Sequence, residues 1–342
     1  MLTYQKIVIV EKEKAELQTD TIDETEIPSG HYLLKTLYSL VSAGTETACY
    51  KGKEAWFPLP GTPGYACAGE VIAKADDVDC VAVGDLVYCR GKHAGLQLMS
   101  IDSPPAKLPA GMDVRYAPFT RMAAISATSL RVSDIELGDD VLVIGLGAVG
   151  NFAAQLATLQ GGNVLGMDLS AMRLKLAADC GVAHTLRTIP GEDMTEQIKA
   201  VFDGRMPATV IDATGIPRVI EQGINYAKTG GQMILLGSPR GEYTGNITNI
   251  LQHVHQFRYR VNLLCSHDLA FPRTDTPYVK HSGQRNERIC LQLIADGRLR
   301  TDKLLTQVLA PEKADETYQA TLHGDENYFG VVFDWTKNRS NA

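Results

Sequence analysis

The hydrophobic positions of this chain follow two different patterns. Up to about residue 110 the apolar runs are short, as in KIVIV (6–10), YLLKTLYS (32–39), GEVIA (69–73) and DLVYCR (85–90), and glycines and prolines separate them. Short apolar runs bounded by turn residues are typical of β-strands. This front part of the sequence therefore predicts an irregular β-barrel or sandwich.

After residue 140, apolar strands alternate with helical stretches. The predicted strands are VLVIG (141–145), NVLGMD (163–168), ATVIDATG (208–215) and QMILLG (232–237). The predicted helices are NFAAQLATLQ (151–160), AMRLKLAADCG (171–181) and VIEQGINYAKTGG (219–231), followed later by NERICLQLIADGRL (286–299) and ADETYQATL (314–322). Strands that are apolar on both faces and alternate with helices indicate a parallel sheet covered on both sides.

Length and charge limit the kinds of partner that the protein can have. A chain of 342 residues is expected to form two domains. Its formal net charge of -7 speaks against binding to nucleic acid or to anionic membranes, and a small-molecule substrate is expected. The uncharged stretch 141–167 contains closely spaced glycines and polar amides, which indicate a buried strand, turn and helix rather than a membrane span.

Cysteine usage and the N-terminus favour a cytoplasmic protein. The seven cysteines are odd in number and form no C-x-x-C pair, which is typical of reduced thiols. The first apolar run meets charged residues at positions 11–14 and offers no signal-peptide core. The oligomeric state stays open between a homodimer and a homotetramer, because an exposed sheet edge often pairs across a two-fold axis.

The strand VLVI runs directly into a glycine-rich turn and then into an apolar helix. The turn consists of Gly145, Leu146, Gly147, Ala148, Val149 and Gly150. The first glycine permits a tight turn, the second lets the backbone approach a pyrophosphate, and the third lets the helix pack close to the strand. The helix N-terminus supplies N–H groups and a positive dipole for the anion. This context predicts a dinucleotide-binding site.

Residues after the neighbouring strands extend this prediction. Asp168 can hydrogen-bond the ribose hydroxyls and would repel a 2′-phosphate, so NAD(H) is preferred; Arg173 could meet such a phosphate, so NADP(H) stays open. Ligands of such sheets bind at the carboxyl ends of the strands. The remaining candidates for cofactor binding are Leu169, Ala213, Thr214, Gly215, Leu236 and Gly237.

Several segments together resemble the medium-chain dehydrogenase/reductase superfamily, which includes the zinc-type alcohol and polyol dehydrogenases. They are V-S-A-G-T-E (41–46), P-G-Y-A-C-A-G-E-V (63–71) and V-G-D (83–85), besides the nucleotide-binding half. The resemblance implies an α/β chain with a GroES-like β-rich catalytic domain and a Rossmann doubly wound parallel-sheet domain. It places the first part of the catalytic domain at 1–118, the Rossmann domain at 119–282 and the closing part of the catalytic domain at 283–342.

The sequence departs from this family at the zinc ligands. The family's ligand Cys corresponds to Ala43, and its His-Glu pair corresponds to Tyr65 and Ala66. Its third ligand falls near TRMAAISATS (120–129), yet no Cys or His occurs from 94 to 179, and the four-cysteine structural zinc loop is absent too. Since zinc needs several such donors, no zinc is expected. The chain resembles a zinc-lacking branch that includes the bacteriochlorophyllide-type dehydrogenases, although Ala66 departs from the glutamate expected there.

Four residues of the front domain are candidates for the chemistry. The Thr45 hydroxyl either relays the alcohol proton or bonds its own turn, and Glu46 either orients that relay or caps a helix beginning at Thr47. Tyr65 could replace the metal by donating a hydrogen bond to the substrate oxygen, or it merely fills the vacated volume. His93, in R-G-K-H-A-G, is either a general acid/base or a loop residue.

Other polar residues are weaker candidates. Arg240 could clamp an anionic substrate group, although an exposed loop arginine is the simpler interpretation. His253, His255 and His267 flank an expected strand, and their spacing matches no closed metal site.

The leading hypothesis is a zinc-independent NAD(H)-dependent oxidoreductase that transfers hydride between nicotinamide and a secondary alcohol or ketone, of sugar or polyol type. One alternative is an NADPH-dependent quinone or enoyl reductase of the same superfamily. The other is a dinucleotide-binding protein without turnover.

Overall fold

The computed structural model describes residues 1–337, and the chain divides into two compact units. The first unit contains Met1–Arg121 together with the segment from Glu287 onward, and the second unit is Met122–Asn286. The domain boundaries expected from the sequence, after residues 118 and 282, fall slightly before these divisions. Among residues 1–337, no helix has both the length and the apolar character needed to cross a membrane.

The second unit is built on a six-stranded sheet in which every pairing is parallel. The strands lie in the order β10-β9-β8-β11-β12-β13, so successive strands extend outward on both sides of β8. This is the strand order of a doubly wound dinucleotide-binding sheet. The chain adds strands toward one edge from β8 to β10 and toward the other edge from β11 to β13, so the order of addition reverses between β8 and β11. Their bounds are β8 (Asp140–Ile144), β9 (Asn163–Asp168), β10 (His184–Arg187), β11 (Thr209–Asp212), β12 (Gln232–Leu235) and β13 (Asn262–Cys265).

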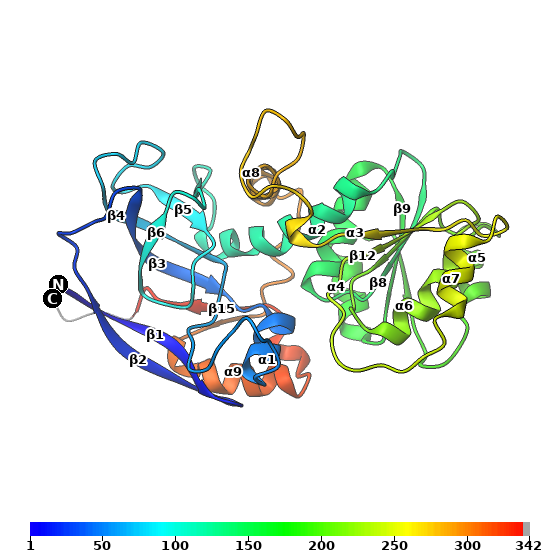
Figure 1. Cartoon of the computed structure of the whole chain (residues 1–342), viewed down its shortest axis with the longest axis horizontal. Coiled ribbons are helices and arrows are strands. Elements are labelled where there is room, and N and C mark those ends of the chain that lie inside the picture. Colours follow the sequence, from blue (N-terminus) through cyan, green and yellow to red (C-terminus); the bar gives the residue numbers. More distant parts are fainter. Residues whose placement is uncertain (338–342) are drawn as a thin grey trace. The chain divides into compact units, whose positions relative to one another are not determined.

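Helices cover the sheet of the second unit, as Figure 1 shows. Every residue of β8 and of β11 is buried, which explains why these strands are apolar at consecutive positions. On one face Leu142 and Val210 join Phe202 in a hydrophobic cluster. The helices are α3 (Ala148–Gln160), α4 (Ala171–Asp179), α5 (Thr195–Val201), α6 (Pro217–Gly223) and α7 (Thr248–His255).

The helix predicted over 219–231 is shorter in the structure. Helix α6 ends at Gly223, and the 3-10 turn η2 (Ile224–Tyr226) follows it. The other 3-10 turns are η1 (Val114–Phe119), η3 (Asp268–Ala270), η4 (Pro311–Lys313) and η5 (Glu326–Tyr328).

The first unit is rich in β-structure. It contains a β1–β2 hairpin and a seven-stranded sheet in the order β14-β15-β3-β4-β5-β7, with β6 also paired to β3. The strands are β1 (Leu2–Glu11), β2 (Lys14–Ile22), β3 (His31–Leu40), β4 (Cys67–Lys74), β5 (Leu86–Cys89), β6 (Leu96–Ser100), β7 (Ala106–Lys107), β14 (Gln307–Leu309) and β15 (Val331–Asp334). Residues far apart in the sequence therefore share one sheet. Strand β15 pairs antiparallel with β3, and Val332 lies opposite Leu40.

Four helices accompany this unit. Helix α1 (Ala43–Tyr50) follows β3 directly, and α9 (Ala314–Leu322) lies against α1 and β2. Helices α2 (Thr120–Val132) and α8 (Gly283–Ala295) each contain residues of both units. The structure thus confirms the predicted combination of a β-rich front part and a doubly wound parallel sheet.

Candidate functional site

The glycine-rich turn after β8 has three glycines in three different environments. Gly145 has a φ of 88°, and a Cβ there would lie 2.6 Å from the Thr214 side chain. A Cβ at Gly150 would lie 1.8 Å from the Gly145 carbonyl oxygen, so α3 can pack against the turn only with glycine at this position. A Cβ at Gly147, by contrast, would meet no atom within 4 Å.

The open space at Gly147 lies at the start of a helix. Gly147 is the N-cap of α3, no side chain caps the helix, and its first turn contains no acidic residue. The first N–H groups of a helix have no acceptor within it, and here they belong to Ala148, Val149 and Gly150. Backbone donors, a positive helix end and free space are the features that a pyrophosphate needs. The residues present therefore fit a dinucleotide.

Asp168, at the end of β9, holds the turn in place. Its Oδ2 accepts a hydrogen bond of 2.7 Å from the Leu146 N–H, and its Oδ1 accepts one of 2.8 Å from the Ser170 N–H. The Arg173 guanidinium lies 3.8 Å from Asp168 Oδ2. Leu169, which lies between Asp168 and Ser170 in the sequence, is exposed. The acidic residue predicted to contact the ribose is thus also part of the loop's own structure, and an arginine lies beside its carboxylate.

The loops after β11 and β12 lie at the same edge of the sheet as the glycine-rich turn, where the strands have their carboxyl ends. The buried Asp212 carboxylate accepts hydrogen bonds from the Thr214 hydroxyl (2.6 Å) and the Gly215 N–H (3.0 Å). Burial raises the pKa of Asp212, and these hydrogen bonds partly offset the rise. A Cβ at Gly215 would lie 2.3 Å from the Ser238 carbonyl oxygen, and one at Gly237 would lie 2.3 Å from the Gly215 nitrogen. The two loops therefore touch backbone to backbone.

The predicted cofactor residues of these loops come together at one edge of the sheet. The Ala213 N–H bonds the Ile144 carbonyl of β8 (2.9 Å), and the N–H groups of Leu236 and Gly237 both bond the Asp212 carbonyl (2.8 Å). The exposed Arg240 follows on the same loop, and its N–H reaches the Gly215 carbonyl at 3.4 Å.

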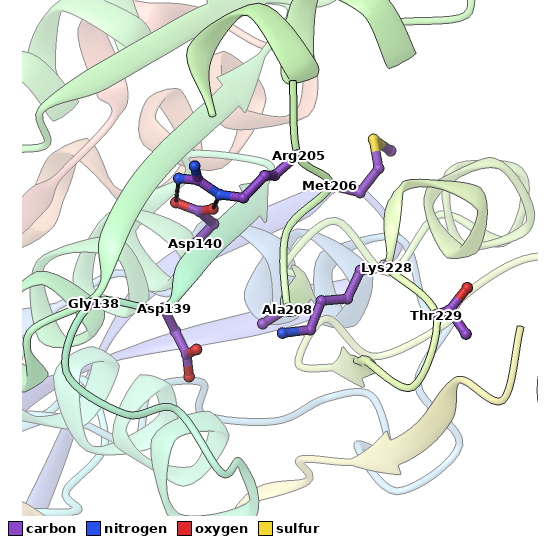
Figure 2. A pocket seen from close by; sticks show the side chains of 8 residues that line it. All are labelled: Gly138, Asp139, Asp140, Arg205, Met206, Ala208, Lys228 and Thr229. Carbon is purple, nitrogen blue, oxygen red and sulfur yellow. Dashed lines mark hydrogen bonds and ion pairs between the residues drawn. The ribbon is translucent and has the colours of Figure 1, made fainter. Parts of the chain in front are cut away.

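A pocket of about 510 Å³ lies at the opposite edge of the sheet. It is lined by residues at or before the amino ends of β8, β11 and β12, namely Gly138, Asp139, Asp140, Arg205, Met206, Ala208, Lys228 and Thr229. Figure 2 shows Arg205 paired with Asp140 in its wall, at 2.9 Å. Because ligands of such sheets bind at the carboxyl ends, this pocket is not part of the dinucleotide site.

In the first unit, Tyr65 belongs to a cluster of hydroxyl groups. Its phenol donates a short hydrogen bond to Ser42 Oγ, and the Thr45 hydroxyl also lies within hydrogen-bonding reach. The Arg121 guanidinium lies over the Tyr65 ring, 5.5 Å from its centre. Burial raises the pKa of Tyr65, while its hydrogen bonds with Ser42 and Thr45 and the charge of Arg121 lower it.

Glu46 and His93 form a second, fully buried network. Glu46 Oε2 accepts hydrogen bonds of 2.8 Å from His93 Nε2 and from the Tyr318 phenol. Glu46 Oε1 accepts one of 2.8 Å from the Ser42 N–H. His93 Nδ1 lies 2.7 Å from Ser39 Oγ. Glu46 therefore links His93 to the segment that also contains Ser42 and Thr45.

The hydrogen-bond pattern places one proton of His93. The Glu46 carboxylate accepts, so His93 Nε2 carries a proton that faces it. On the other side, Ser39 Oγ accepts from the Trp335 indole N–H at 2.8 Å and can exchange a hydrogen bond with His93 Nδ1 in either direction. Since His93 has no exposed surface and both nitrogens bond to protein groups, its geometry favours positioning over direct proton exchange with a substrate.

Two sequence-based interpretations need correction or extension. The helix expected to begin at Thr47 begins at Ala43, so Glu46 lies within its first turn; its carboxylate still reaches back to the Ser42 N–H. Ser42 and Arg121 were missed. Arg121 lies in the segment 120–129, where the family resemblance pointed to a zinc ligand and not to a cation.

Two histidines of the second unit, His253 and His267, make ordinary structural contacts. His253 is buried, stacks on Tyr259 with ring centres 4.1 Å apart, and bonds the Asn249 carbonyl at 2.9 Å. His267 Nδ1 accepts a hydrogen bond from the Leu269 N–H (3.2 Å). Within residues 1–337, no three His, Cys, Asp or Glu side chains are grouped so as to hold a metal ion.

Comparisons with known proteins agree with this architecture. Residues 148–268 match the family model described as "Zinc-binding dehydrogenase". The chain is 26% identical to L-galactonate-5-dehydrogenase of Escherichia coli K12 over 340 residues, covering 90% of this chain and 94% of that protein. It is 26% identical to D-guloside 3-dehydrogenase of Shigella flexneri, covering 79% of this chain and 77% of that protein.

The crystal structure of galactitol-1-phosphate dehydrogenase from Escherichia coli has the same fold, with a TM-score of 0.81 and 17% identity over 96% of this chain and 99% of that one. The matches extend over both the β-rich part and the parallel sheet. Residues 148–268 thus match a zinc-binding dehydrogenase family, and most of the chain is similar to dehydrogenases of sugar acids and sugar derivatives, in agreement with the resemblance to the medium-chain dehydrogenase/reductase superfamily.

Proposed function

We propose that this protein is a zinc-independent, NAD(H)-dependent oxidoreductase that interconverts a secondary alcohol and a ketone of sugar or polyol type. The observation that carries the proposal is the turn at Gly147. It combines open space, a helix N-terminus without a side-chain cap, and flanking glycines that the fold itself requires.

The residues that would hold the cofactor lie along one edge of the parallel sheet. The N–H groups of Ala148, Val149 and Gly150 would bind the pyrophosphate, and Asp168 would bind the ribose hydroxyls. When bound, the nicotinamide supplies the group that accepts or donates the hydride. Asp168 supports NAD(H), whereas Arg173 at 3.8 Å from its carboxylate supports the alternative, an NADPH-dependent quinone or enoyl reductase.

The residues at the family's zinc-ligand positions do not fit zinc. Ala43 and Ala66 offer no donor atom in their side chains. The phenol of Tyr65 bonds to Ser42, and the positive charge of Arg121 over the Tyr65 ring would repel a cation. The substrate oxygen must therefore be polarised by protein hydrogen-bond donors, and Tyr65 is our candidate for that role.

The relatives support the substrate class. Two are named for a sugar acid and a glycoside, L-galactonate and D-guloside, and one structural neighbour is named for a polyol phosphate. A polyhydroxylated substrate with one reactive secondary carbinol is consistent with all three names.

The proposal is tested by incubating purified protein with a panel of keto-sugars, keto-sugar acids and simple ketones and measuring NADH oxidation. The zinc content of the same protein is measured by elemental analysis. We expect turnover without zinc. Stoichiometric zinc in active protein would contradict the metal-free site, a preference for NADPH with quinones or activated alkenes would favour the alternative reductase, and NADH binding without any turnover would favour a non-catalytic binding protein.

Two variants connect this activity to the turn. Gly147→Val is expected to fold, because a Cβ at this position meets no protein atom, and to lose NADH binding by at least tenfold, because the side chain fills the space of the pyrophosphate. Thr158→Val, at the exposed far end of the same helix, is the control and should bind NADH as the parent protein does. Equal NADH affinity of the two variants would refute the assignment of the turn.

A further inference from the structure

An arginine lies close to the positions from which the family's metal ligands have been lost. Arg121 is the second residue of α2, in the segment expected to supply the third ligand. Its guanidinium lies 5.5 Å from the centre of the Tyr65 ring, and Tyr65 replaces the ligand histidine. A positive charge of the protein is therefore close to the phenol that is our candidate for polarising the substrate oxygen.

The position of Arg121 is fixed by groups on other elements. Its side chain is only 9% exposed, and its Nη1 lies 3.8 Å from Glu287 Oε1 on α8. The same carboxylate accepts hydrogen bonds from Arg90 Nε (2.6 Å) and the Tyr88 phenol (3.1 Å). Because this cluster holds the guanidinium away from water, its charge acts on its neighbours more strongly than that of an exposed arginine.

We propose that Arg121 and Tyr65 together perform the task that zinc performs in the relatives, with Tyr65 as the proton-exchanging group and Arg121 as the fixed positive charge that stabilises its phenolate. This inference rests on the proposed function. In alcohol oxidation the Tyr65 phenolate would take the substrate hydroxyl proton as the C=O bond forms, and a bound oxidised dinucleotide would supply the acceptor for the hydride lost from the carbinol carbon.

In the reverse direction the Tyr65 O–H donates its proton to the oxygen of the forming alcohol as the hydride arrives. The phenolate that remains is stabilised by Arg121 and accepts hydrogen bonds from the Ser42 and Thr45 hydroxyls, which can reverse their donor direction. Solvent then returns the proton. The reaction balances in both directions with the dinucleotide as the only redox partner of the substrate.

The charges around Tyr65 set the direction of the expected effects. Burial raises the pKa of Tyr65 and the Glu46 carboxylate raises it further, whereas the Ser42 and Thr45 hydroxyls and Arg121 lower it. Glu46 on α1 and Arg121 on α2 are the charged groups that act on the phenol. Removal of the Arg121 charge should therefore move the phenol pKa upward, and alcohol oxidation, which needs the phenolate, should require a higher pH.

The experiment compares Arg121→Met and Arg121→Lys with Tyr65→Phe, and uses Arg115→Met as the control. Arg115 is a nearby exposed arginine that pairs with Asp113. For Arg121→Met we expect kcat/KM to fall about tenfold or more. The rise of kcat/KM with pH in alcohol oxidation, called the pH limb below, should occur about one pH unit higher than in the parent. Arg121→Lys should keep the limb near its original pH, Tyr65→Phe should lose about 100-fold in kcat, and Arg115→Met should retain activity.

Arg121→Met leaves Glu287 paired with Arg90 at 2.6 Å, so no buried charge loses its last partner and the variant is expected to fold. If the folded Arg121→Met variant keeps the parent pH profile and kcat/KM within twofold, the proposal is wrong. If both the limb and the activity shift as stated, it is supported.

A second measurement does not depend on turnover. 3-Fluorotyrosine is placed at position 65, and its ¹⁹F chemical shift is followed against pH in the parent and in Arg121→Met. An upward shift of the phenol pKa by about one unit supports the role of Arg121 even if no substrate is found, which would leave the proposed function at fault instead. An unchanged titration overturns the inference, whatever the activity.

Discussion

At the scale of single residues, Glu46 connects segments of the first unit that lie far apart in the sequence. Its carboxylate accepts hydrogen bonds from the Ser42 N–H, from His93 and from Tyr318, which lie on three separate segments. A carboxylate this deeply buried is tolerated because hydrogen-bond donors replace the water that it has lost. The segments that carry Ser42, Thr45 and Gly64 are consequently held together around His93, since a Cβ at Gly64 would lie 2.7 Å from the His93 nitrogen.

This linkage predicts a strong energetic coupling between Glu46 and His93. Glu46→Gln and His93→Asn should each lower the free energy of unfolding by about 3–5 kcal/mol, because each leaves a buried partner unsatisfied. The double variant should lose less than the sum of the two, by about 1–3 kcal/mol, as measured by urea denaturation.

The matched control pairs Glu46→Gln with His253→Asn. His253 is also buried but bonds to Asn249 and stacks on Tyr259, so it shares no partner with Glu46. That double variant should be additive within about 0.5 kcal/mol. Additivity of the Glu46/His93 pair as well would show that the bond between them contributes no coupling.

Single residues were predictable from the sequence where the pattern is local. The turn from Gly145 to Gly150 and Asp168 stand out because strand, glycines and helix follow one another directly. Tyr318 and Trp335 could not be linked to Glu46 and Ser39, because they lie 272 and 296 positions further along the chain. Arg121 was not predicted, because its proximity to Tyr65 arises from the fold and no local pattern joins the two residues.

At the scale of elements, the junction between β9 and α4 determines how Asp168 is presented. The Ser170 hydroxyl caps α4 by accepting a hydrogen bond from the Arg173 N–H (3.1 Å), which keeps Arg173 in the first turn beside Asp168. The Asp168 carboxylate in turn bonds the N–H of Leu146 in the glycine-rich turn. One carboxylate thus fixes the loop and sets the charge expected to face the ribose.

The choice between the two dinucleotides should therefore respond to Asp168→Asn. We expect the ratio of kcat/KM for NADPH to that for NADH to rise about tenfold, because the repulsion of a 2′-phosphate disappears and Arg173 loses its acidic partner. A loss of about 1 kcal/mol in stability should accompany it, since the amide cannot accept both N–H bonds. Steady-state kinetics with both cofactors and urea denaturation measure the two effects.

Arg173→Gln serves as the opposite variant and should lower the use of NADPH. If neither substitution changes the cofactor ratio, Asp168 only supports the turn, and the preference for NAD(H) has another origin.

The elements themselves were predictable where apolar periodicity was strong. The bounds of β9 and α9 match the runs NVLGMD and ADETYQATL. Strand β2, KAELQTDTI, was not predicted because its residues are mostly polar and half-exposed, and it forms only by pairing with β1. Helix α6 ends before its apolar pattern does because the chain tightens into η2.

At the scale of the whole molecule, buried tyrosines make stability depend on alkaline pH. Burial raises the pKa of Tyr32, Tyr88 and Tyr318, all in the first unit. Below about pH 10 each is protonated in both the folded and the unfolded chain, so its contribution to stability is complete. Above that pH the unfolded chain loses protons that the folded chain retains, so stability falls as pH rises toward the folded pKa.

The corresponding prediction concerns Tyr32→Phe. One pH unit above the ordinary tyrosine pKa, the parent protein should lose about 1.4 kcal/mol through Tyr32 alone, and the variant should not. The free energy of unfolding in urea is measured at several values between about pH 8 and 11. Tyr278→Phe is the control, because Tyr278 is 92% exposed and should leave the pH dependence unchanged.

The pairing of β15 with β3 has a consequence for how the protein is made. A ribosome releases residues 1–121 first and then the whole second unit before Val331 emerges. The parallel sheet can therefore be complete while the edge of β3 formed by residues 38–40 still lacks its neighbour, β15. Translation that stops before Val331 should leave that edge open to strands of other chains, and truncated products should aggregate although their nucleotide-binding unit is intact.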